Sequence, residues 1–394
     1  MRRRPAGPPR RRGRGFGSVF ILLIVFAAAA GGARHTPAAE DDVRKTETIV
    51  PGIEQIEIRR GDFSTAPGND RWTIHVLVLD PAKIRLGLGI ALDEIVGSET
   101  TSSIAVRHGA VAAVNGGYFR TTGLLKGEPA GMLAVGGKVL SEPAKGRASL
   151  AVTNAGGKVQ IAFAHVAIKA ELQVEDGPSC AVNGFNRDRA PNDLIILTTE
   201  FHRTTLTDPS GMEAIVKDGR IIEIRDKLGS APIPEDGFVI SARGAGRDWM
   251  RLSLRPGARV EIKTEINARP ALPFKPDFIL GGGPRLLAGG KPVPSEAEAY
   301  PADFYTTRHP RTAAGLRGDG AIVLAVVDGR QPKIGVGLSI DELSALMAEL
   351  GCVEAINLDG GGSSTMVVGG RVVNSPADAA GERPVSDALL VYRK

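Results

Sequence analysis

The chain has 394 residues and a formal net charge of +5, with 50 glycines and only two cysteines. This length is enough to bury the core of one large domain or of two ordinary ones. Seven arginines lie within the first fourteen residues, and without them the charge becomes −2, which excludes a basic nucleic-acid-binding surface on the folded part.

The N-terminus predicts export. Those arginines precede the apolar run FGSVFILLIVFAAAA and small residues up to Ala33, which is the order of a secretory signal peptide. The run is short for a membrane-spanning helix of about 20 residues, so cleavage near Ala33 is favoured over an uncleaved N-terminal anchor. We expect residues 34–48 to form a flexible tether, because they are polar and show no periodicity. The protein would be periplasmic or extracellular, and would touch a membrane only through an uncleaved leader.

Strand signals begin at Arg71 and continue to the end of the chain. WTIHVLVLD alternates, TTSSIAVRHG predicts a short helix closed by Gly109, and AVAAVNGGYF is a small-residue strand that runs into glycines. Later segments such as MLAVGGKVL, RLLAGGKPV, AIVLAVVDGR and TMVVGGRVV carry Gly-Gly or Asp-Gly between apolar runs, as tight hairpin turns require. SIDELSALMAELG is an amphipathic helix with Ser339 as its N-cap.

These signals predict an α+β fold, a largely antiparallel or mixed sheet rich in hairpins with a few packed helices. Residues 49–394 would form a single compact domain, in which residues 160–270 are a candidate inserted subdomain. Cys180 and Cys352 are compatible with one disulfide, and equally with two unpaired buried thiols. Two cysteines are too few for a zinc site with Cys ligands, and no His-x-x-x-His pairing exists among the six histidines.

Three glycine-rich polar segments each precede a hairpin, and we expect them to meet at one place. They are NGGYF, GGGP and DGGGSS. In the third, Asp359 is followed by Gly360, Gly361 and Gly362, which would point backbone N–H groups into one anion-binding concavity, with the hydroxyls of Ser363 and Ser364 beside it. The alternative is a glycine-rich bend in which the Asp bonds its own turn.

Familiar nucleotide and hydrolase motifs are absent from the sequence. GGSST lacks the final glycine of a nucleophile elbow, and no Gly-Lys-Ser/Thr follows a glycine run. RHPRTAAGL instead offers Arg311 as a planar fork for a phosphate, with Arg308 and His309 next to it.

Taken together, AVNGGYF, GGGPRLL, HPRTAAGL, VVDGR, AINLDGGGSSTM and ERPVSDALLV occur in the order seen in the phosphodiester glycosidase family, which this chain resembles over about residues 70–393. The resemblance implies hydrolysis of a sugar-1-phosphodiester to a free sugar and a phosphomonoester. Residues 160–270 match no motif of that family, and substrate selection there is unassigned. We expect no lysosomal glycoprotein substrate, because the cysteine-rich, membrane-spanning C-terminal part of the animal enzymes has no counterpart in this sequence.

We expect the matching motifs to contain the site. A phosphomonoester is a good leaving group, so charge stabilisation on the departing phosphate matters more than a strong general acid. The expected catalytic residues are Asp359, Arg311 and Glu128, with Glu128 ranked after Asp359. The expected substrate-binding residues are Asn115, Gly116, Gly282, Gly283, His309, Thr312, Asp328, Gly360, Gly361, Gly362, Ser363 and Ser364.

Two further expectations concern Asp359 and the class of function. Next to a bound phosphate, Asp359 would have a raised pKa, unless a Ca²⁺ or Mg²⁺ held by Asp359 and loop carbonyls offset the charge. The partner would be a sugar phosphodiester or an anionic glycan, and the sequence does not indicate the oligomeric state. The alternatives to the glycosidase are a non-catalytic envelope protein that binds anionic polysaccharide, and a phosphodiesterase that cuts the P–O bond.

Overall fold

The computed structural model describes residues 42–394 except 65–67, 69 and 295–297. The predicted leader, residues 1–33, and most of the predicted tether lie outside the described residues. Within them, the chain is rich in mostly antiparallel strands with few helices, as predicted. No helix in this described part is long and apolar enough to cross a membrane.

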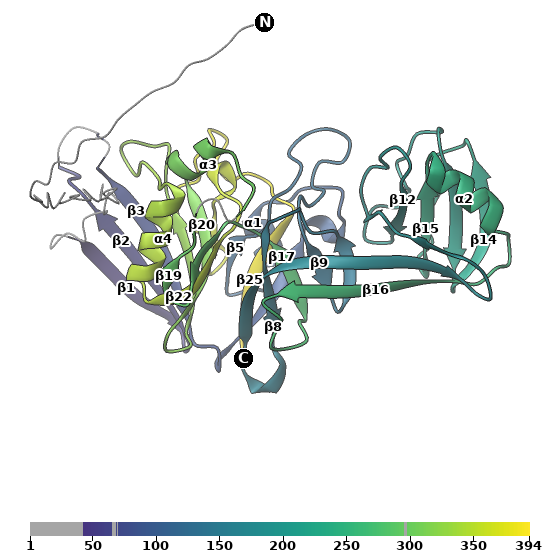
Figure 1. Cartoon of the computed structure of the whole chain (residues 1–394). Helices are drawn as coiled ribbons and strands as arrows, with labels where there is room; N and C mark the ends of the chain where they lie inside the picture. Colours follow the sequence, from purple (N-terminus) through teal and green to yellow (C-terminus); the bar gives the residue numbers. More distant parts are fainter. Residues whose placement is uncertain (1–41, 65–67, 69, 295–297) are drawn as a thin grey trace, which may run out of the picture. The chain divides into compact units, whose positions relative to one another are not determined.

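An eight-stranded antiparallel sheet carries two of the helices, α3 (Ala302–Thr306) and α4 (Ile340–Glu349), near its β18–β22 side (Figure 1). Ser339 caps α4, and a reciprocal bond with Glu342 completes the capping box, as the sequence predicts. In sheet order the strands are β1 (Val43–Val50), β2 (Ile53–Arg60), β3 (Trp72–Leu79), β21 (Ile322–Val327), β20 (Arg311–Arg317), β22 (Cys352–Asn357), β18 (Arg285–Ala288) and β19 (Lys291–Pro292).

The first strand of this sheet corrects the predicted tether. Residues 43–48 belong to β1, which pairs with β2 as an edge strand. Their side chains are exposed on both faces, which is why the segment has no hydrophobic period, and the backbone ladder holds it in place. Arg60 adds an anchor through ion pairs with Asp42 and Glu349.

The second sheet has five antiparallel strands, and the helix α1 (Thr101–Arg107) packs against it. Its order is β24 (Arg371–Val372), β23 (Met366–Val368), β5 (Ala112–Asn115), β25 (Asp387–Arg393) and β4 (Ile84–Ile90). The hairpin between β23 and β24 turns at Gly369 and Gly370, both with positive φ, as the Gly-Gly signal predicts.

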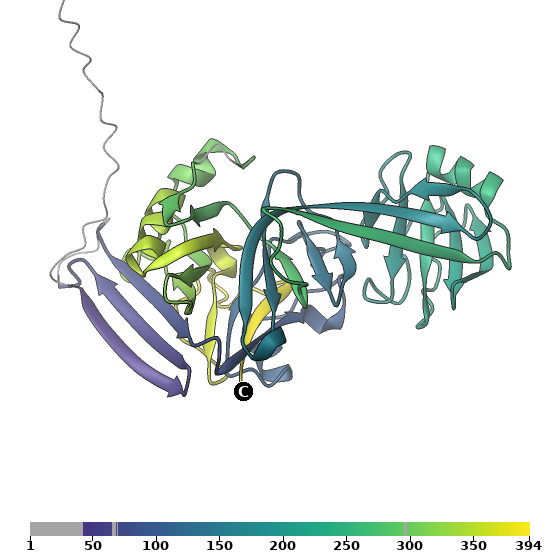
Figure 2. The same ribbon diagram turned by 60° about the horizontal axis from the view of Figure 1, so that its bottom comes forward.

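The third sheet contains the longest strands, β9 (Gln160–Val174) and β16 (Val260–Arg269), which run side by side as a ribbon (Figure 2). Its path is β10 (Ser179–Ala181), β9, β8 (Ala148–Thr153), β17 (Phe278–Gly281), β6 (Leu133–Val135) and β7 (Lys138–Ser141). Cys180 lies in this sheet and Cys352 in the first one, and both are free thiols, so the disulfide alternative is wrong.

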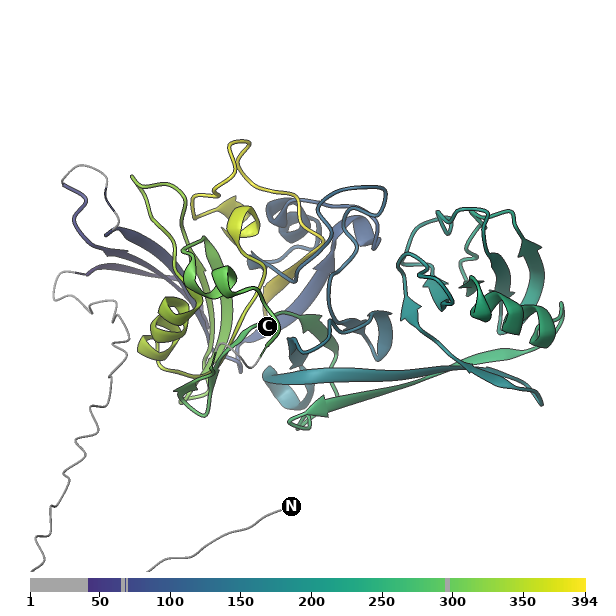
Figure 3. The same cartoon turned by 45° about the horizontal axis from the view of Figure 1, so that its top comes forward.

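The segment between β9 and β16 folds around a sheet of its own, with the helix α2 (Ala245–Ser253) packed against it (Figure 3). This sheet has the order β11 (Gly184–Phe185), β12 (Leu194–Thr198), β15 (Gly237–Ala242), β13 (Met212–Lys217) and β14 (Arg220–Asp226). The division into an outer domain and an inserted subdomain over 160–270 stays a prediction.

Candidate active site

A buried amide, Asn115 at the end of β5, joins segments that are far apart in the sequence. Its Nδ2 donates to the backbone oxygen of Asp359 at 2.7 Å. Its Oδ1 accepts from Thr312 Oγ1 at 2.7 Å and from the N–H of Thr365 at 3.1 Å. The structure thus brings Asn115 and Thr312 together with the Asp359 loop. Both side chains are fully buried, so they support the loop from the protein interior.

The glycine loop itself differs from the predicted anion nest. The N–H of Gly360 donates to Asp359 Oδ1, and the N–H of Gly361 donates to Pro310 O. Ser363 and Ser364 donate their N–H groups back to Gly360 O and Gly361 O, in a 3₁₀ turn. Among the described residues, only Gly362 of this loop has an N–H without a hydrogen-bond partner. The loop is therefore closed on itself, as the bend alternative predicts.

Asp359 is a partly exposed carboxylate in an environment that favours its protonated form. Burial raises the pKa of Asp359 to about 6, while Ser363, the N–H of Gly360 and Arg383 act in the opposite direction. The expected rise in the pKa of Asp359 is present, and its largest cause in this structure is loss of solvation. A carboxylate with this pKa is mostly ionised at neutral pH and can accept a proton in the physiological range.

A second buried carboxylate, Asp387 at the start of β25, was missed in the sequence. It accepts from the N–H of Gly117 at 2.8 Å and from Ser386 Oγ at 2.7 Å, and burial raises its pKa. Its negative charge also raises the pKa of Asp359. Gly116 lies between the two carboxylates, because its oxygen accepts from the N–H of Asp359 and a Cβ there would collide with Asp387. The only available signal was its place in the motif ERPVSDALLV.

Three consecutive hydroxyls follow the glycines in a buried position. Ser363, Ser364 and Thr365 are at most 1% exposed; the Ser363 hydroxyl acts on Asp359, while the side-chain oxygens of Ser364 and Thr365 make no hydrogen bond in the described part of the chain. Two such neighbours are unusual, because buried hydroxyls are normally paired. They stay candidates for contact with substrate or water.

Asp328, expected to bind substrate, is instead an internal support. It lies fully buried after β21 and accepts from His75 Nε2, Asn374 Nδ2 and the N–H of Ser375. Asn374 in turn accepts from the N–H of Met366 and donates to Ser364 O. The DG pair is therefore no hairpin turn, and Asp328 acts on the site through Asn374.

Arg311 also departs from its expected role as an open fork. Its Nε donates to Leu338 O, and its Nη2 donates to Phe304 O and Thr307 O. The side chain is 2% exposed, and burial lowers the pKa of Arg311 to about 10. Its geometry is set by backbone carbonyls, so it can act on a bound anion mainly through its charge.

Arg330 is an exposed cation near the site that the sequence did not predict. Arg330 donates to Nδ1 of His309 at 3.1 Å, and its guanidinium lies beside Gly361. Burial lowers the pKa of His309, and the charges of Arg330 and Arg311 lower it further, so a neutral ring with its proton on Nε2 is favoured. Arg330 has a φ of 58°, a left-handed conformation that is costly for a residue with a side chain. It pairs with no carboxylate among the residues described.

Gly282 and Gly283 fix aromatic side chains at the border of the site. Tyr300 donates its hydroxyl to Gly282 O, and Tyr118 donates to Gly283 O at 2.8 Å. Asn357 Nδ2 contacts both Gly283 O and the Tyr118 hydroxyl. Because both glycines are buried and their carbonyls are occupied, direct substrate contact by them is not supported; they position Tyr118 and Tyr300.

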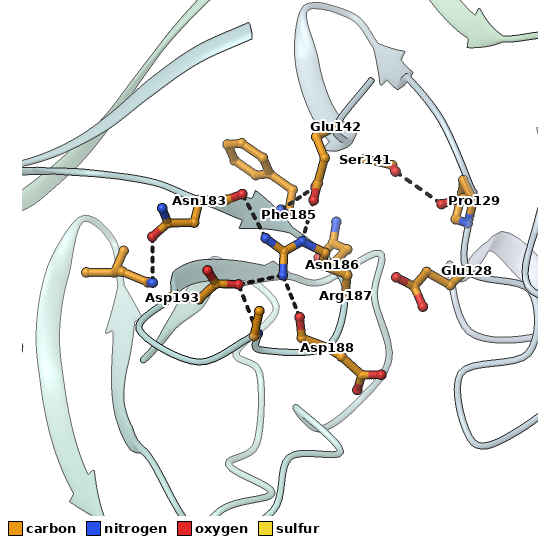
Figure 4. Close-up of polar contacts among 12 residues, drawn as sticks. Glu128, Pro129, Ser141, Glu142, Asn183, Phe185, Asn186, Arg187, Asp188 and Asp193 are labelled. Atoms are coloured by element: carbon orange, nitrogen blue, oxygen red, sulfur yellow. Dashed lines mark hydrogen bonds and ion pairs between the residues drawn. The ribbon is translucent and has the colours of Figure 1, made fainter. Parts of the chain in front are cut away.

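Glu128 is placed elsewhere. It forms an ion pair with Arg120 at 3.1 Å, and its other charged neighbours are Asp188, Glu142 and Arg187 (Figure 4). Burial raises the pKa of Glu128 to about 7, against the attraction of Arg120. Within the described ranges no hydrogen bond or ion pair links it to residues 359–364. The loop after NGGYF turns toward the 184–193 segment, a direction that sequence proximity cannot indicate.

A divalent cation at Asp359, the alternative that the sequence leaves open, stays untested. In the described part of the chain, no three His, Cys, Asp or Glu side chains gather in a way that could hold a metal. Asp359 and Asp387 are two oxygen-ligand residues close to each other, but their oxygens already accept hydrogen bonds from Gly360, Gly117 and Ser386.

Comparison with known proteins agrees with the resemblance seen in the motifs. Residues 210–392 match the family model of phosphodiester glycosidase. The YomE protein of the Bacillus subtilis SPbeta prophage is 40% identical over 106 residues, 27% of this chain and 16% of that protein. The N-acetylglucosamine-1-phosphodiester alpha-N-acetylglucosaminidase of mouse is 28% identical over 158 residues, 37% of this chain and 30% of the mouse protein. This chain thus spans less than a third of either relative.

A solved structure shows the same fold. A protein of Burkholderia pseudomallei that carries the name of an exported protein superposes on this chain with a TM-score of 0.78. The match covers 90% of this chain and 97% of the Burkholderia chain, at 23% sequence identity. The resemblance to the phosphodiester glycosidase family is confirmed by the family match and by the named relatives.

Proposed function

We propose that this chain, as a relative of the phosphodiester glycosidases, is a hydrolase that cleaves the glycosidic C–O bond of a sugar-1-phosphodiester. Water adds across the bond: its hydroxyl goes to the anomeric carbon, and the phosphate leaves as a monoester. The names of the mouse and human relatives support a substrate of this class. The observation that carries the proposal is one loop that holds the carboxylate of Asp359, close to Asp387, and that lies beside the guanidinium of Arg330 at Gly361.

In this mechanism Asp359 acts on the sugar side of the scissile bond. With a pKa of about 6 it is mostly ionised at neutral pH, and it can take a proton from the attacking water or stabilise positive charge at the anomeric carbon. Asp387 is a positioning residue, because it holds the N–H of Gly117 and keeps the Asp359 pKa high.

On the phosphate side, the residues supply positive charge and a donor. Arg330 would neutralise the charge that develops on the departing phosphate, while the Nε2–H of neutral His309 would donate to one of its oxygens. The buried guanidinium of Arg311 would add its positive charge on the phosphate side from a fixed position, because backbone carbonyls hold it in place. A good leaving group of this kind makes a strong general acid unnecessary.

Hydrolysis in ¹⁸O-labelled water tests the proposal against both alternatives. Label in the sugar product supports C–O cleavage, and label in the phosphomonoester would show a phosphodiesterase. If purified protein releases neither product from a panel of sugar phosphodiesters but retains anionic polysaccharide, it is a binding protein.

We also propose that the protein works outside the cytoplasm, on envelope or extracellular glycans. The arginine-rich leader and the name of the Burkholderia protein support export. N-terminal sequencing of protein from the cell exterior should begin near residue 34. A cytoplasmic protein with an intact leader would contradict export.

A further inference from the structure

Two arginines and two aromatic rings form a continuous stack at the border of the site. The guanidinium carbon of Arg147 lies 4.4 Å from the ring centroid of Tyr300. Tyr300 stacks on Phe304 with centroids 4.6 Å apart and planes at 20°, and the guanidinium carbon of Arg311 lies 5.0 Å from the Phe304 centroid. Such contacts order an arginine in one place without using its hydrogen-bond donors.

Arg147 has no carboxylate partner among the described residues, unlike Arg285 and Arg308. Arg285 is ion-paired with Glu354, and Arg308 with Glu342. The guanidinium of Arg147 makes no hydrogen bond or ion pair within the described residues; it lies over Tyr300 and, at 5.6 Å, over Tyr118. Its five N–H donors are thus held in position and free to meet an anion.

The stack is adjacent to the proposed catalytic carboxylate. Burial raises the pKa of Tyr118, and the charges of Asp359, Arg311 and Arg147 all act on the same hydroxyl. The ring of Tyr118 contacts both Tyr300 and Phe304 at centroid distances of 6.2 and 6.5 Å, and Gly116, two residues before Tyr118, accepts the N–H of Asp359. Within the stack, Arg147 lies over Tyr300 and Arg311 over Phe304, so the two cations are at opposite ends.

We propose that Arg147 binds a second anionic group of the substrate, separate from the scissile phosphodiester. The preferred substrate is then a glycan with at least two charges, such as a chain of repeating sugar phosphates. Tyr118, Tyr300 and Phe304 would offer apolar surface to the sugar or linker between the two anions. This inference rests on the proposed function and names its substrate class.

The test compares two substrates, of which only one carries a second phosphate. One is N-acetylglucosamine-1-phosphate esterified to methanol, and the other is the same sugar phosphate esterified to glycerol phosphate. For Arg147→Gln, KM for the doubly charged substrate should rise at least about tenfold with kcat little changed, as expected for loss of one charge-assisted contact. KM for the methyl ester should change by less than about twofold.

Arg85→Gln is the matched control, because Arg85 also lies over a tyrosine ring, Tyr392, at 5.2 Å and has no ion pair in the described structure. It should leave both KM values unchanged. An equal rise in KM for both substrates would assign Arg147 to the scissile phosphate and overturn the second subsite, as would no rise for either.

If the wild type cleaves neither compound, the proposed function fails but Arg147 can still be tested. Calorimetric binding of the glycerol phosphate compound should then be at least about tenfold weaker for Arg147→Gln than for the wild type. Equal binding by the two proteins, or no binding by the wild type, would refute the subsite itself.

Discussion

Asp359→Asn should make the protein more stable and much less active. In the folded chain the pKa of Asp359 is about 6, against an ordinary 3.8. A rise of about two pKa units corresponds to about 3 kcal/mol of folding free energy that is lost when the carboxylate ionises. Asparagine has nearly the same shape and no charge, and its side-chain oxygen can still accept from the N–H of Gly360.

The sign of the pH dependence follows from the direction of the shift. The folded state binds the proton of Asp359 more tightly than the unfolded state does. The contribution of this proton to the folding free energy of the wild type is therefore fully present below pH 3.8 and is lost as the pH rises to about 6. The variant lacks this loss. The difference in unfolding free energy should be near zero below about pH 3, grow from about pH 4 to pH 6, and level off at about 3 kcal/mol.

Urea unfolding at several pH values, with linear extrapolation to water, measures this difference. The activity of the same samples on a sugar phosphodiester should fall at least about a hundredfold, the low end for a positioned acid or base. A variant that is less stable than the wild type at pH 7, or a difference that does not change with pH, would refute the raised pKa assigned to Asp359. Near-normal turnover would remove Asp359 from the mechanism.

Three further substitutions probe the supports of the site. Asp387→Asn should remove a like charge from Asp359, and the acid limb of the kcat/KM profile should move below pH 6; a profile that stays in place would contradict their coupling. Asn115→Ala leaves three buried partners unpaired and should cost about 3 to 5 kcal/mol in urea unfolding, whereas a loss below about 1 kcal/mol would show that the amide is dispensable. Glu128→Gln should lower kcat less than about threefold, because Glu128 lies apart from the Asp359 loop; a hundredfold loss would return it to the catalytic residues.

The sequence predicted the features that depend on residues close together in the chain. Hairpins such as the one at Gly369–Gly370, and the capping box at Ser339, depend on neighbours within a few positions, and both are present. The raised pKa of Asp359 was also expected, although its cause is burial.

The missed and misplaced residues depend on distant partners. The glycine loop differs from the predicted nest because Pro310 O, 51 positions earlier in the sequence, accepts the N–H of Gly361. Asp387 and Arg330 gave no periodic or glycine-rich signal, and each matters only through contacts made across strands. Glu128 belongs to the loop after NGGYF, but that loop carries it toward Arg187.

The amide of Asn115 also ties the appearance of the site to the end of folding. It bonds Asp359, Thr312 and Thr365, which lie 244, 197 and 250 positions away, and it connects strands of two different sheets. Contacts of such sequence separation close large loops and form late. A chain that is still being synthesised or is held unfolded has not yet formed these bonds, so the proposed hydrolysis would begin only in the complete, folded molecule.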